Sequence, residues 1–293
     1  MSNNVLFDSV RENLLELNKR GSILNEQRSI LVSELADSII GEFGSDAPDA
    51  MYREFQRALD FANISDRLIF SEKLAAHYHP KDLTRLLLSS DGEGLIRAGT
   101  HGKISYIRNR YNDEAYARFS SVIPHAKPLF FSDFEECCEA IASGESEFTI
   151  LPLEDSVDGK MFGFYSLLDR YALKIAYVCN VEREDNSKNI KYALAGKYFH
   201  LSHLEKTKKD IARTFEFTMT QSPSTNLLDL YSAVQTFNAL ENRISSVYLP
   251  YGDNLARFYH SVTISKKTDF LPFLLFLSLE YPDYTPIGIY REI

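Results

Sequence analysis

The segment TILPLEDSVDG, residues 149–159, places two carboxylates and a hydroxyl directly after a β-rich run. The run ends at a proline, and Glu154, Asp155 and Ser156 follow close together. Open α/β sheets bind ligands at the carboxyl ends of their strands, so we expect these side chains to hold a small molecule. A loop in which Asp155 or Ser156 caps the next helix explains the same pattern without a ligand.

The stretch GTHGKIS, residues 99–105, is a second candidate site. Its glycines would let backbone amides approach an anion, and the N-terminus of a following helix favours negative charge. The sequence predicts that helix over residues 103–117, with Ser105 in its first turn. A tight turn that binds nothing is the alternative interpretation.

Arg28 is the third candidate, because it occupies a helical seam position between two leucines. A guanidinium placed there must be paired or must face a ligand, and arginine is well suited to a carboxylate. Arg11 lies beside the same seam, and the pair Arg53-Glu54 comes early in the next helical segment. Together these residues predict either an anion-binding site or an interhelical salt-bridge network.

Arg11 and Arg28 lie within the first forty residues, and the apolar pattern of this segment predicts one long helix. Apolar residues recur there at alternating spacings of three and four, which is a heptad seam that requires a partner. At about 1.5 Å per residue the helix would be roughly 50–60 Å long, too long to bury the seam against a small domain. We therefore expect a homodimer. The seam positions are Phe7, Val10, Leu14, Leu17, Gly21, Leu24, Arg28, Leu31 and Leu35.

After residues 89–94, SSDGEG, the pattern alternates between strands and helices. This alternation indicates an α/β layer structure, followed by a charged linker over 197–213. The predicted strands lie near 94–98, 128–131, 147–152, 172–180 and 189–196, with helices near 103–117, 132–143 and 160–169.

The last eighty residues predict a strand and helix order of βαββαβ, which is the ferredoxin-like arrangement. The fold class is therefore multidomain α + α/β. We expect an all-helical dimerising domain over 1–93, one small α/β lobe over 94–200 and the βαββαβ domain over 211–293.

The composition excludes several classes of protein. Of the 293 residues 44% are hydrophobic and 25% are charged, which is ordinary for a globular protein. The net charge of −9 argues against a nucleic-acid partner. No apolar run has the length of a membrane span, and the first residues lack a signal-peptide pattern. The three cysteines have no zinc-ligand spacing, so we expect a cytoplasmic protein with no metal or other cofactor.

Taken in order, these features resemble the bifunctional chorismate mutase–prephenate dehydratases of phenylalanine biosynthesis, over almost the whole chain. LIRAGTHGKISY is similar to the opening strand and turn of the dehydratase, and VRENLLELNKRGSILNEQRSILVSELA to the first helix of the helical mutases. The last eighty residues resemble the ACT regulatory domain. The most specific match is the dehydratase segment that contains Phe134, Ala140, Gly144, Pro152, Glu154, Ser156 and Gly159.

The resemblance implies roles for particular residues. Arg11 and Arg28 match the two substrate-binding arginines of the mutase helix, and Arg53-Glu54 match a pair on the second helix, so these four are the expected catalytic residues. Ser105, Glu154 and Ser156 are expected to bind substrate. The implied ligand is a small dicarboxylate such as chorismate or prephenate. The implied assembly is a homodimer in which Arg11 of one chain completes the other chain's site. The two chains are expected to pair through the N-terminal helix, either alone or together with the ACT-like domain.

The sequence also departs from the family at each site. Ile39 stands where the mutases have a lysine that stabilises the ether oxygen of chorismate, and isoleucine cannot supply that charge. The second dehydratase lobe is missing, so the opposite wall of the cleft is expected to be absent. The Thr-Arg-Phe motif of the dehydratases reads Ile190-Lys191-Tyr192, without the hydroxyl.

The ACT-like region departs in the same way. The family's phenylalanine-binding turn reads Leu228-Asp229-Leu230 here, and its strand end reads YLPY over 248–251. Two principal functions therefore remain open: a chorismate mutase-like isomerase of aromatic metabolism, and a catalytically inactive dimeric protein that binds a ligand or acts as a scaffold. A new reaction on a prephenate-like compound in a specialised pathway is a third alternative. Prephenate dehydration is not expected, because half of its cleft is missing.

Overall fold

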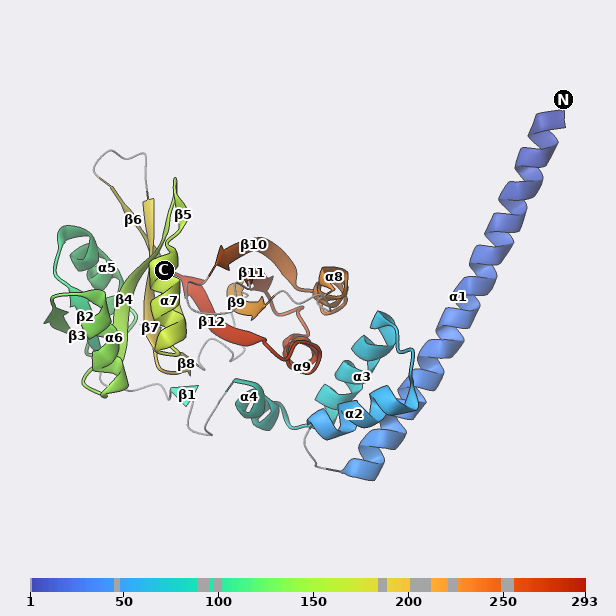
Figure 1. The fold of residues 1–293 in the computed structure, drawn as a ribbon, viewed down its shortest axis with the longest axis horizontal. Helices are drawn as coiled ribbons and strands as arrows, with labels where there is room; N and C mark the ends of the chain where they lie inside the picture. The colour runs from blue at the N-terminus through green and yellow to red at the C-terminus, as the bar shows by residue number, and fades with distance from the viewer. Residues whose placement is uncertain are drawn as a thin grey trace. The chain divides into compact units, whose positions relative to one another are not determined.

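The chain is divided into two compact units, residues 1–80 and 81–293 (Figure 1). The structure, a computed structural model, describes residues 2–44, 48–88, 95–96, 102–183, 189–200, 212–220, 226–248 and 256–293. The boundary expected at residue 93 lies outside the described residues, as does most of the expected linker. The division of the second unit into two domains stays a prediction.

The first unit consists of helices α1 (Ser2–Phe43), α2 (Pro48–Ala58) and α3 (Ile64–His77). The single long helix predicted for the first forty residues is confirmed, and it is roughly 60 Å long at about 1.5 Å per residue. It ends at Gly44, which has a φ of 66° and donates its backbone N–H to the carbonyl of Ile40 at 3.0 Å. This left-handed residue is a common helix stop, and glycine adopts it without a steric penalty.

Only the C-terminal part of α1 is covered by α2 and α3. There Val32, Ala36 and Ile39 are buried, and between α2 and α3 the rings of Phe55 and Phe70 stack with centroids 4.3 Å apart. The N-terminal part of α1 extends beyond the two shorter helices (Figure 1). Its apolar side chains are 46–65% exposed, namely Val10, Leu14, Leu15, Leu17, Ile23, Leu24, Ile30 and Leu31.

The second unit is built on a mixed ten-stranded sheet. Nine strands follow the order β10-β11-β9-β12-β6-β7-β4-β2-β3, and β5 pairs with β4. A separate parallel pair joins β1 (Leu95–Ile96) to β8 (Phe199–His200). The sheet strands are β2 (Lys103–Ile107), β3 (Lys127–Phe131), β4 (Phe148–Asp155), β5 (Gly159–Lys160), β6 (Lys174–Glu182), β7 (Asn189–Gly196), β9 (Arg213–Thr220), β10 (Leu240–Tyr248), β11 (Ala256–Ile264) and β12 (Thr285–Glu292).

Helices pack on both faces of the sheet. The helices of this unit are α4 (Pro80–Leu88), α5 (Arg110–Ser120), α6 (Phe134–Ala142), α7 (Phe162–Arg170), α8 (Leu227–Thr236) and α9 (Phe270–Glu280). Phe119 of α5 belongs to one core, with Ile150 of β4 and Cys179 of β6. Ile141 of α6 and Leu168 of α7 belong to a second core. The residues that β4 and β6 contribute to this second core alternate along each strand with those of the first core. Because side chains alternate between the faces of a strand, the sheet is buried on both sides here.

The predicted βαββαβ order is present in the C-terminal part, from β9 through α8, β10, β11 and α9 to β12. These four strands are antiparallel and run in the order β10-β11-β9-β12. Phe215 and Phe217 of β9 contact the ring of Phe273 in α9, with centroids 6.3 and 6.4 Å apart. Alternation therefore turns Glu216, which lies between the two phenylalanines, to the other face of the sheet.

The predicted helix over 103–117 is wrong in its first part. Residues 103–107 form strand β2, which is hydrogen-bonded in parallel to β3 and to β4. The helix begins only after Asn109, whose side chain accepts the backbone N–H of Asn112 at 2.9 Å. Ile104 and Tyr106 are buried on one face and Ser105 on the other, so this short run is buried on both faces and lacks the alternation that would have marked it as a strand.

The two halves of the sheet meet where β12 pairs in parallel with β6. Gly288 lies at this contact, and a Cβ atom at that position would come within 2.7 Å of the Cβ of Ile175 and 2.9 Å of its carbonyl oxygen. Only a residue without a side chain allows β12 to approach β6 this closely.

We predict that Gly288→Ala destabilises the second unit by about 1–3 kcal/mol, because the added methyl group collides with Ile175 and its backbone. Gly163→Ala is the control, since a Cβ at Gly163 in helix α7 meets no atom within 4 Å and alanine is the better helix former. Denaturant unfolding measures both. Equal midpoints for the two variants would contradict a tight β6–β12 contact.

Candidate functional site

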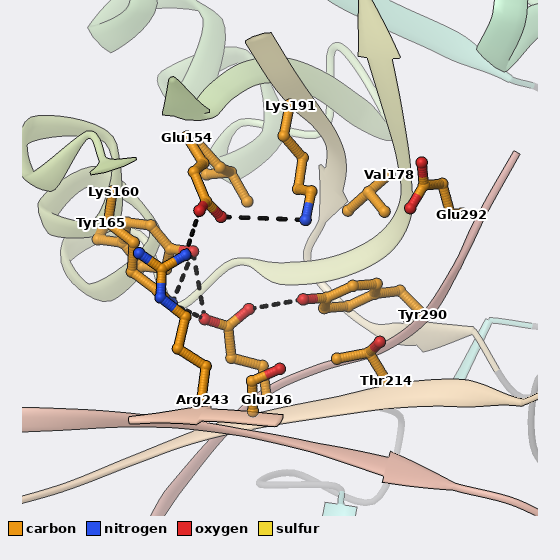
Figure 2. A pocket seen from close by; sticks show the side chains of 12 residues that line it. Glu154, Lys160, Tyr165, Val178, Lys191, Thr214, Glu216, Arg243, Tyr290 and Glu292 are labelled. Carbon is orange, nitrogen blue, oxygen red and sulfur yellow. Dashed lines mark hydrogen bonds and ion pairs between the residues drawn. The ribbon is translucent and has the colours of Figure 1, made fainter. Parts of the chain in front are cut away.

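A cavity of about 280 Å³ lies where the two halves of the sheet meet (Figure 2). Residues of β4, β5, α7, β6 and β7 line one side, and residues of β9, β10, β11 and β12 line the other. The absence of the second dehydratase lobe stays a prediction, and other elements face β4 across this cavity. The C-terminal βαββαβ elements supply a wall beside the carboxyl end of β4.

Glu154 lies at the rim of this cavity. It bonds through one carboxylate oxygen to the guanidinium of Arg243, and its other oxygen is 3.9 Å from the ammonium of Lys191. The register of β4 against β7 shifts between Pro152 and Glu154, so that Glu154 lies opposite Lys191. Such a bulge re-aims the side chain that follows it. The rim is partly open to solvent, with exposures of 21% for Glu154, 35% for Lys191 and 45% for Arg243.

The floor is a buried network around Glu216 (Figure 2). The ammonium of Lys160 donates to Oε1 of Glu216, and to the hydroxyl of Tyr165 at 3.0 Å. The hydroxyl of Tyr165 donates to the same Oε1 at 3.2 Å, and that of Tyr290 donates to Oε2 at 2.8 Å. The side chains of Lys160 and Glu216 are only 5% and 2% exposed. A buried charge pair is tolerated when its remaining lone pairs and protons are hydrogen-bonded, as they are here.

The two tyrosines of the floor act as hydrogen-bond donors. Burial, together with the negative charge of Glu216, holds the pKa of Tyr165 well above its usual value. The same two causes hold the pKa of Tyr290 well above its usual value. Both hydroxyls therefore stay protonated at neutral pH and donate to the carboxylate of Glu216. The ring of Tyr165 also lies under the ammonium of Lys160, 4.4 Å from its centroid, which adds a cation–π contact.

Of the residues predicted after β4, the structure brings only Glu154 to the cavity lining within the described part of the chain. The hydroxyl of Ser156 accepts the backbone N–H of Asn189 at 2.9 Å, and the backbone N–H of Ser156 donates to the carbonyl of Asn189. Asp155 accepts the backbone N–H of Val157 at 2.9 Å and pairs with Arg183 at 3.0 Å. Asp155 and Ser156 thus shape the turn, but neither caps the next helix, because the N-cap of α7 is Met161 without a side-chain hydrogen bond.

Ser105 lies inside the second unit. Its hydroxyl is buried and hydrogen-bonds to the carbonyl oxygens of Cys137 at 2.9 Å and Phe148 at 3.1 Å, which ties α6 to the sheet. Of the predicted glycine turn, residues 99–101 lie outside the described residues, whereas Gly102 is described and buried. A ligand-binding role for Ser105 stays a prediction, and in this structure its hydroxyl faces protein atoms.

In the helical unit Arg28 is already paired. Its Nε is 3.0 Å from one oxygen of Asp66 and its Nη2 is 2.7 Å from the other, so the contact is bidentate. Asp66 is buried and also accepts the backbone N–H of Asn63 in a capping box at the start of α3. Hydrogen bonding to Asp66 raises the pKa of Arg28. This contact is the interhelical salt bridge that the sequence left open as an alternative.

The other predicted mutase residues lie apart from this pair. Arg11 is exposed, about 25 Å from Arg28 along α1 at 1.5 Å per residue. Arg53 is exposed, and Glu54 bonds Arg57 within α2 at 3.3 Å. Ile39, at the position of the family's lysine, is buried with 5% exposure. Within one chain, therefore, the structure joins Arg28 to Asp66 and does not bring Arg11 to it.

The cysteines offer no nucleophile. All three are buried and free, and burial raises the pKa of Cys137, Cys138 and Cys179 to about 12, so their thiols stay protonated at neutral pH. Within the described ranges no group of three His, Cys, Asp or Glu side chains is arranged to hold a metal ion. Over the same ranges no helix has both the length and the apolar content needed to cross a bilayer.

Sequence reasoning missed Lys160, Glu216, Arg243 and Tyr290. One signal was available for Glu216, which stands between two phenylalanines in the strand TFEFTMT of a region rich in aromatic residues. A lone charge at the centre of an apolar strand must be paired if both faces are buried. Its partner Lys160 precedes it by more than fifty residues, and no pattern links the two.

Comparison with known proteins gives distant likenesses. No family model matches the chain, and no curated protein matches it. Among solved structures it is similar to a prephenate dehydratase from Streptococcus mutans, with 19% identity and a TM-score of 0.48 over 65% of this chain and 98% of that one. It is also similar to GqqA, described as a novel type of quorum quenching acylase, with 18% identity and a TM-score of 0.48 over 66% and 95% of the two chains.

A third similar structure is the prephenate dehydratase from Arthrobacter aurescens in complex with L-Phe. Its identity to this chain is 13% and its TM-score is 0.47, over 64% of this chain and 90% of that one.

We predict that Lys160→Met lowers the free energy of unfolding by about 3–5 kcal/mol, because it leaves Glu216 charged and buried without its cation. Adding Glu216→Gln removes that charge, while the amide oxygen still accepts the hydroxyl of Tyr290. The double variant is expected to regain about 1–3 kcal/mol. Denaturant unfolding of the two single variants and the double variant gives the coupling energy. A coupling near zero would contradict the buried pair.

Proposed function

We propose that the chain is a homodimeric binding protein for a small carboxylate-containing metabolite, and that the cavity of the second unit is its ligand site. The observation that carries the proposal is the rim, where the cations of Lys191 and Arg243 meet beside a hollow of about 280 Å³. Two cations on separate strands suit the two oxygens of a carboxylate. The volume is just below the range of roughly 300–1,000 Å³ that is usual for pockets of larger ligands.

The resemblance to the aromatic-pathway enzymes supplies the first ligands to test. Chorismate and prephenate are small dicarboxylates, and Glu154 belongs to the segment that carries the most specific match. Dehydration of prephenate is not part of the proposal. Ile190 offers no hydroxyl, and the titratable groups of the floor are committed to one another in the Lys160–Glu216 network.

The unpartnered stripe on α1 supports the homodimer. Eight large apolar side chains between Val10 and Leu31 are about half exposed in a single chain, and burying the exposed half of each would contribute about 1 kcal/mol. A second copy of the same helix carries the same heptad seam and so offers a complementary apolar surface. The occupant we propose for this stripe is therefore α1 of a second chain.

Isomerisation of chorismate in the helical unit is the second candidate, and the placing of the arginines favours it. If two copies of α1 pair antiparallel with a twofold axis between residues 19 and 20, Arg11 of one chain lies level with Arg28 of the other. Gly21 would lie close to that axis, where its missing side chain leaves space. Against this candidate stand the Arg28–Asp66 pair and the buried Ile39.

One titration separates the two candidates. The full-length protein is titrated calorimetrically with chorismate and with prephenate, and each mixture is then analysed by mass-resolved chromatography. We expect saturable binding without conversion, lost in Arg243→Gln and kept in the control Arg257→Gln. Arg257 pairs with Asp169 near the same junction but is not among the described residues that line the cavity. Prephenate formed from chorismate and abolished by Arg28→Ala would overturn the binding-only reading in favour of the isomerase.

We predict that Leu24→Glu converts the dimer to a monomer, because it places a charge in the apolar seam. Ser22→Glu adds the same charge to an exposed position outside the seam and should leave the dimer intact. Sedimentation velocity at several protein concentrations measures both. A monomeric parent protein would contradict the proposed assembly, and so would a Leu24→Glu variant that remains dimeric.

A further inference from the structure

We infer that the cavity of the second unit selects a zwitterion, a small molecule that carries an ammonium group as well as a carboxylate. This inference rests on the proposed function and makes its ligand class more specific. The observation behind it is the position of Glu154, which lies between the two rim cations rather than apart from them (Figure 2).

The rim ion pairs are weak enough to exchange. Arg243 is 45% exposed and Lys191 35% exposed, and ion pairs in such settings are worth roughly 0–1 kcal/mol. A ligand carboxylate can therefore replace Glu154 as the partner of Arg243 and Lys191 at little cost in free energy. Doing so leaves Glu154, which is only 21% exposed, beside a second negative charge and without a cation.

An ammonium group on the ligand removes that penalty. It gives Glu154 a new cation while the ligand carboxylate takes the old ones, so each ion pair of the rim is exchanged for another. A ligand with a carboxylate but no amine leaves Glu154 without a counter-charge. A ligand with an amine but no carboxylate has to share Glu154 with Arg243. The pocket thus favours a molecule that offers both groups a few ångströms apart.

The buried ion pair of the cavity floor cannot exchange its partners with a ligand. Lys160 and Glu216 are 5% and 2% exposed and are held by Tyr165 and Tyr290, so neither is available to exchange its partner. Separating them would leave buried charges unpaired, which is strongly unfavourable. Glu154 is therefore the carboxylate of the cavity that is placed to receive an ammonium group.

The charges of the whole lining agree with this reading. Among the described lining residues, three cations face three carboxylates, so their formal charges cancel. A zwitterion preserves that balance and is expected to bind more tightly than a dianion such as chorismate or prephenate, which leaves an excess of two negative charges in a partly enclosed space. The charged residues are Lys160, Lys191 and Arg243 against Glu154, Glu216 and Glu292.

The apolar part of the lining is small. Leu153 and Val178 contribute aliphatic surface, and the tyrosines of the floor contribute ring faces. This surface fits a short aliphatic group attached to the charged end of the ligand. L-Leucine is therefore a suitable probe, because its two single-charge analogues exist. 4-Methylpentanoate lacks only the amino group, and 3-methylbutylamine lacks only the carboxylate.

The test titrates full-length protein with these three compounds by calorimetry, after a thermal-shift screen of the common L-amino acids. If the screen ranks another amino acid first, its own two single-charge analogues replace those of leucine. We expect the amino acid to bind at least about tenfold more tightly than either analogue. Glu154→Gln should remove that preference while 4-methylpentanoate binds as before. Arg243→Gln should abolish binding of both carboxylates, and Arg257→Gln should change neither affinity.

The failures can be told apart. If 4-methylpentanoate binds as tightly as leucine, the zwitterion inference is overturned and the proposed carboxylate site stands. A preference for leucine that persists in Glu154→Gln overturns the role of Glu154. Binding that persists in Arg243→Gln moves the site elsewhere in the chain. If neither chorismate, prephenate, any amino acid nor 4-methylpentanoate binds, the proposed function and the inference both fall.

Discussion

The parallel pairing of β6 with β12 is the contact on which the second unit depends. It joins the strands of the α/β part to the four antiparallel strands of the C-terminal part, and so makes one sheet of the two. The contact links residues more than one hundred positions apart, which is costly in chain entropy before other contacts compensate for it. Gly288 allows it by leaving room for Ile175. Without this pairing, the two walls of the cavity would not face each other.

The three principal ion pairs differ in burial, and burial decides whether each pair can exchange its partners. Lys160–Glu216 is nearly inaccessible and fully hydrogen-bonded, so it fixes the two parts of the second unit together. Arg28–Asp66 has one buried and one half-exposed partner, and it fastens α1 to the start of α3. Arg243–Glu154 is solvated and therefore exchangeable. The same chemical pairing gives a structural link in two cases and a candidate binding site in the third.

The helical unit shows how one helix can be stable in part and incomplete in part. From Val32 onward α1 is buried by α2 and α3, whereas the stripe from Val10 to Leu31 has no cover in the single chain. A helix in a protein owes most of its stability to the packing of its apolar face. In the homodimer that we propose, a second chain would supply that packing from Val10 to Leu31, which would link the dimer to the length of α1.

Elements whose residues repeat with a clear period could be predicted from the sequence. The heptad spacing of residues 7–35 gave the long helix, and the alternation and turn residues after residue 211 gave the βαββαβ order. The motif after β4 gave one residue of the cavity, Glu154. It also led to the expectation of binding by Ser156, which stays a prediction; in this structure its hydroxyl accepts the backbone N–H of Asn189. Strand β2 was missed because Ile104, Ser105 and Tyr106 are buried on both faces and leave no alternation to read.

Which charges meet depends on the three-dimensional fold. Lys160 meets Glu216, Glu154 meets Arg243, and Arg28 meets Asp66, and each pair is separated by tens of residues in the chain. A sequence pattern reports local period and local charge, but the pairing of two distant side chains depends on strand order and register. Here that order places the βαββαβ strands beside the α/β part, and with them the wall that the sequence alone gave no reason to expect.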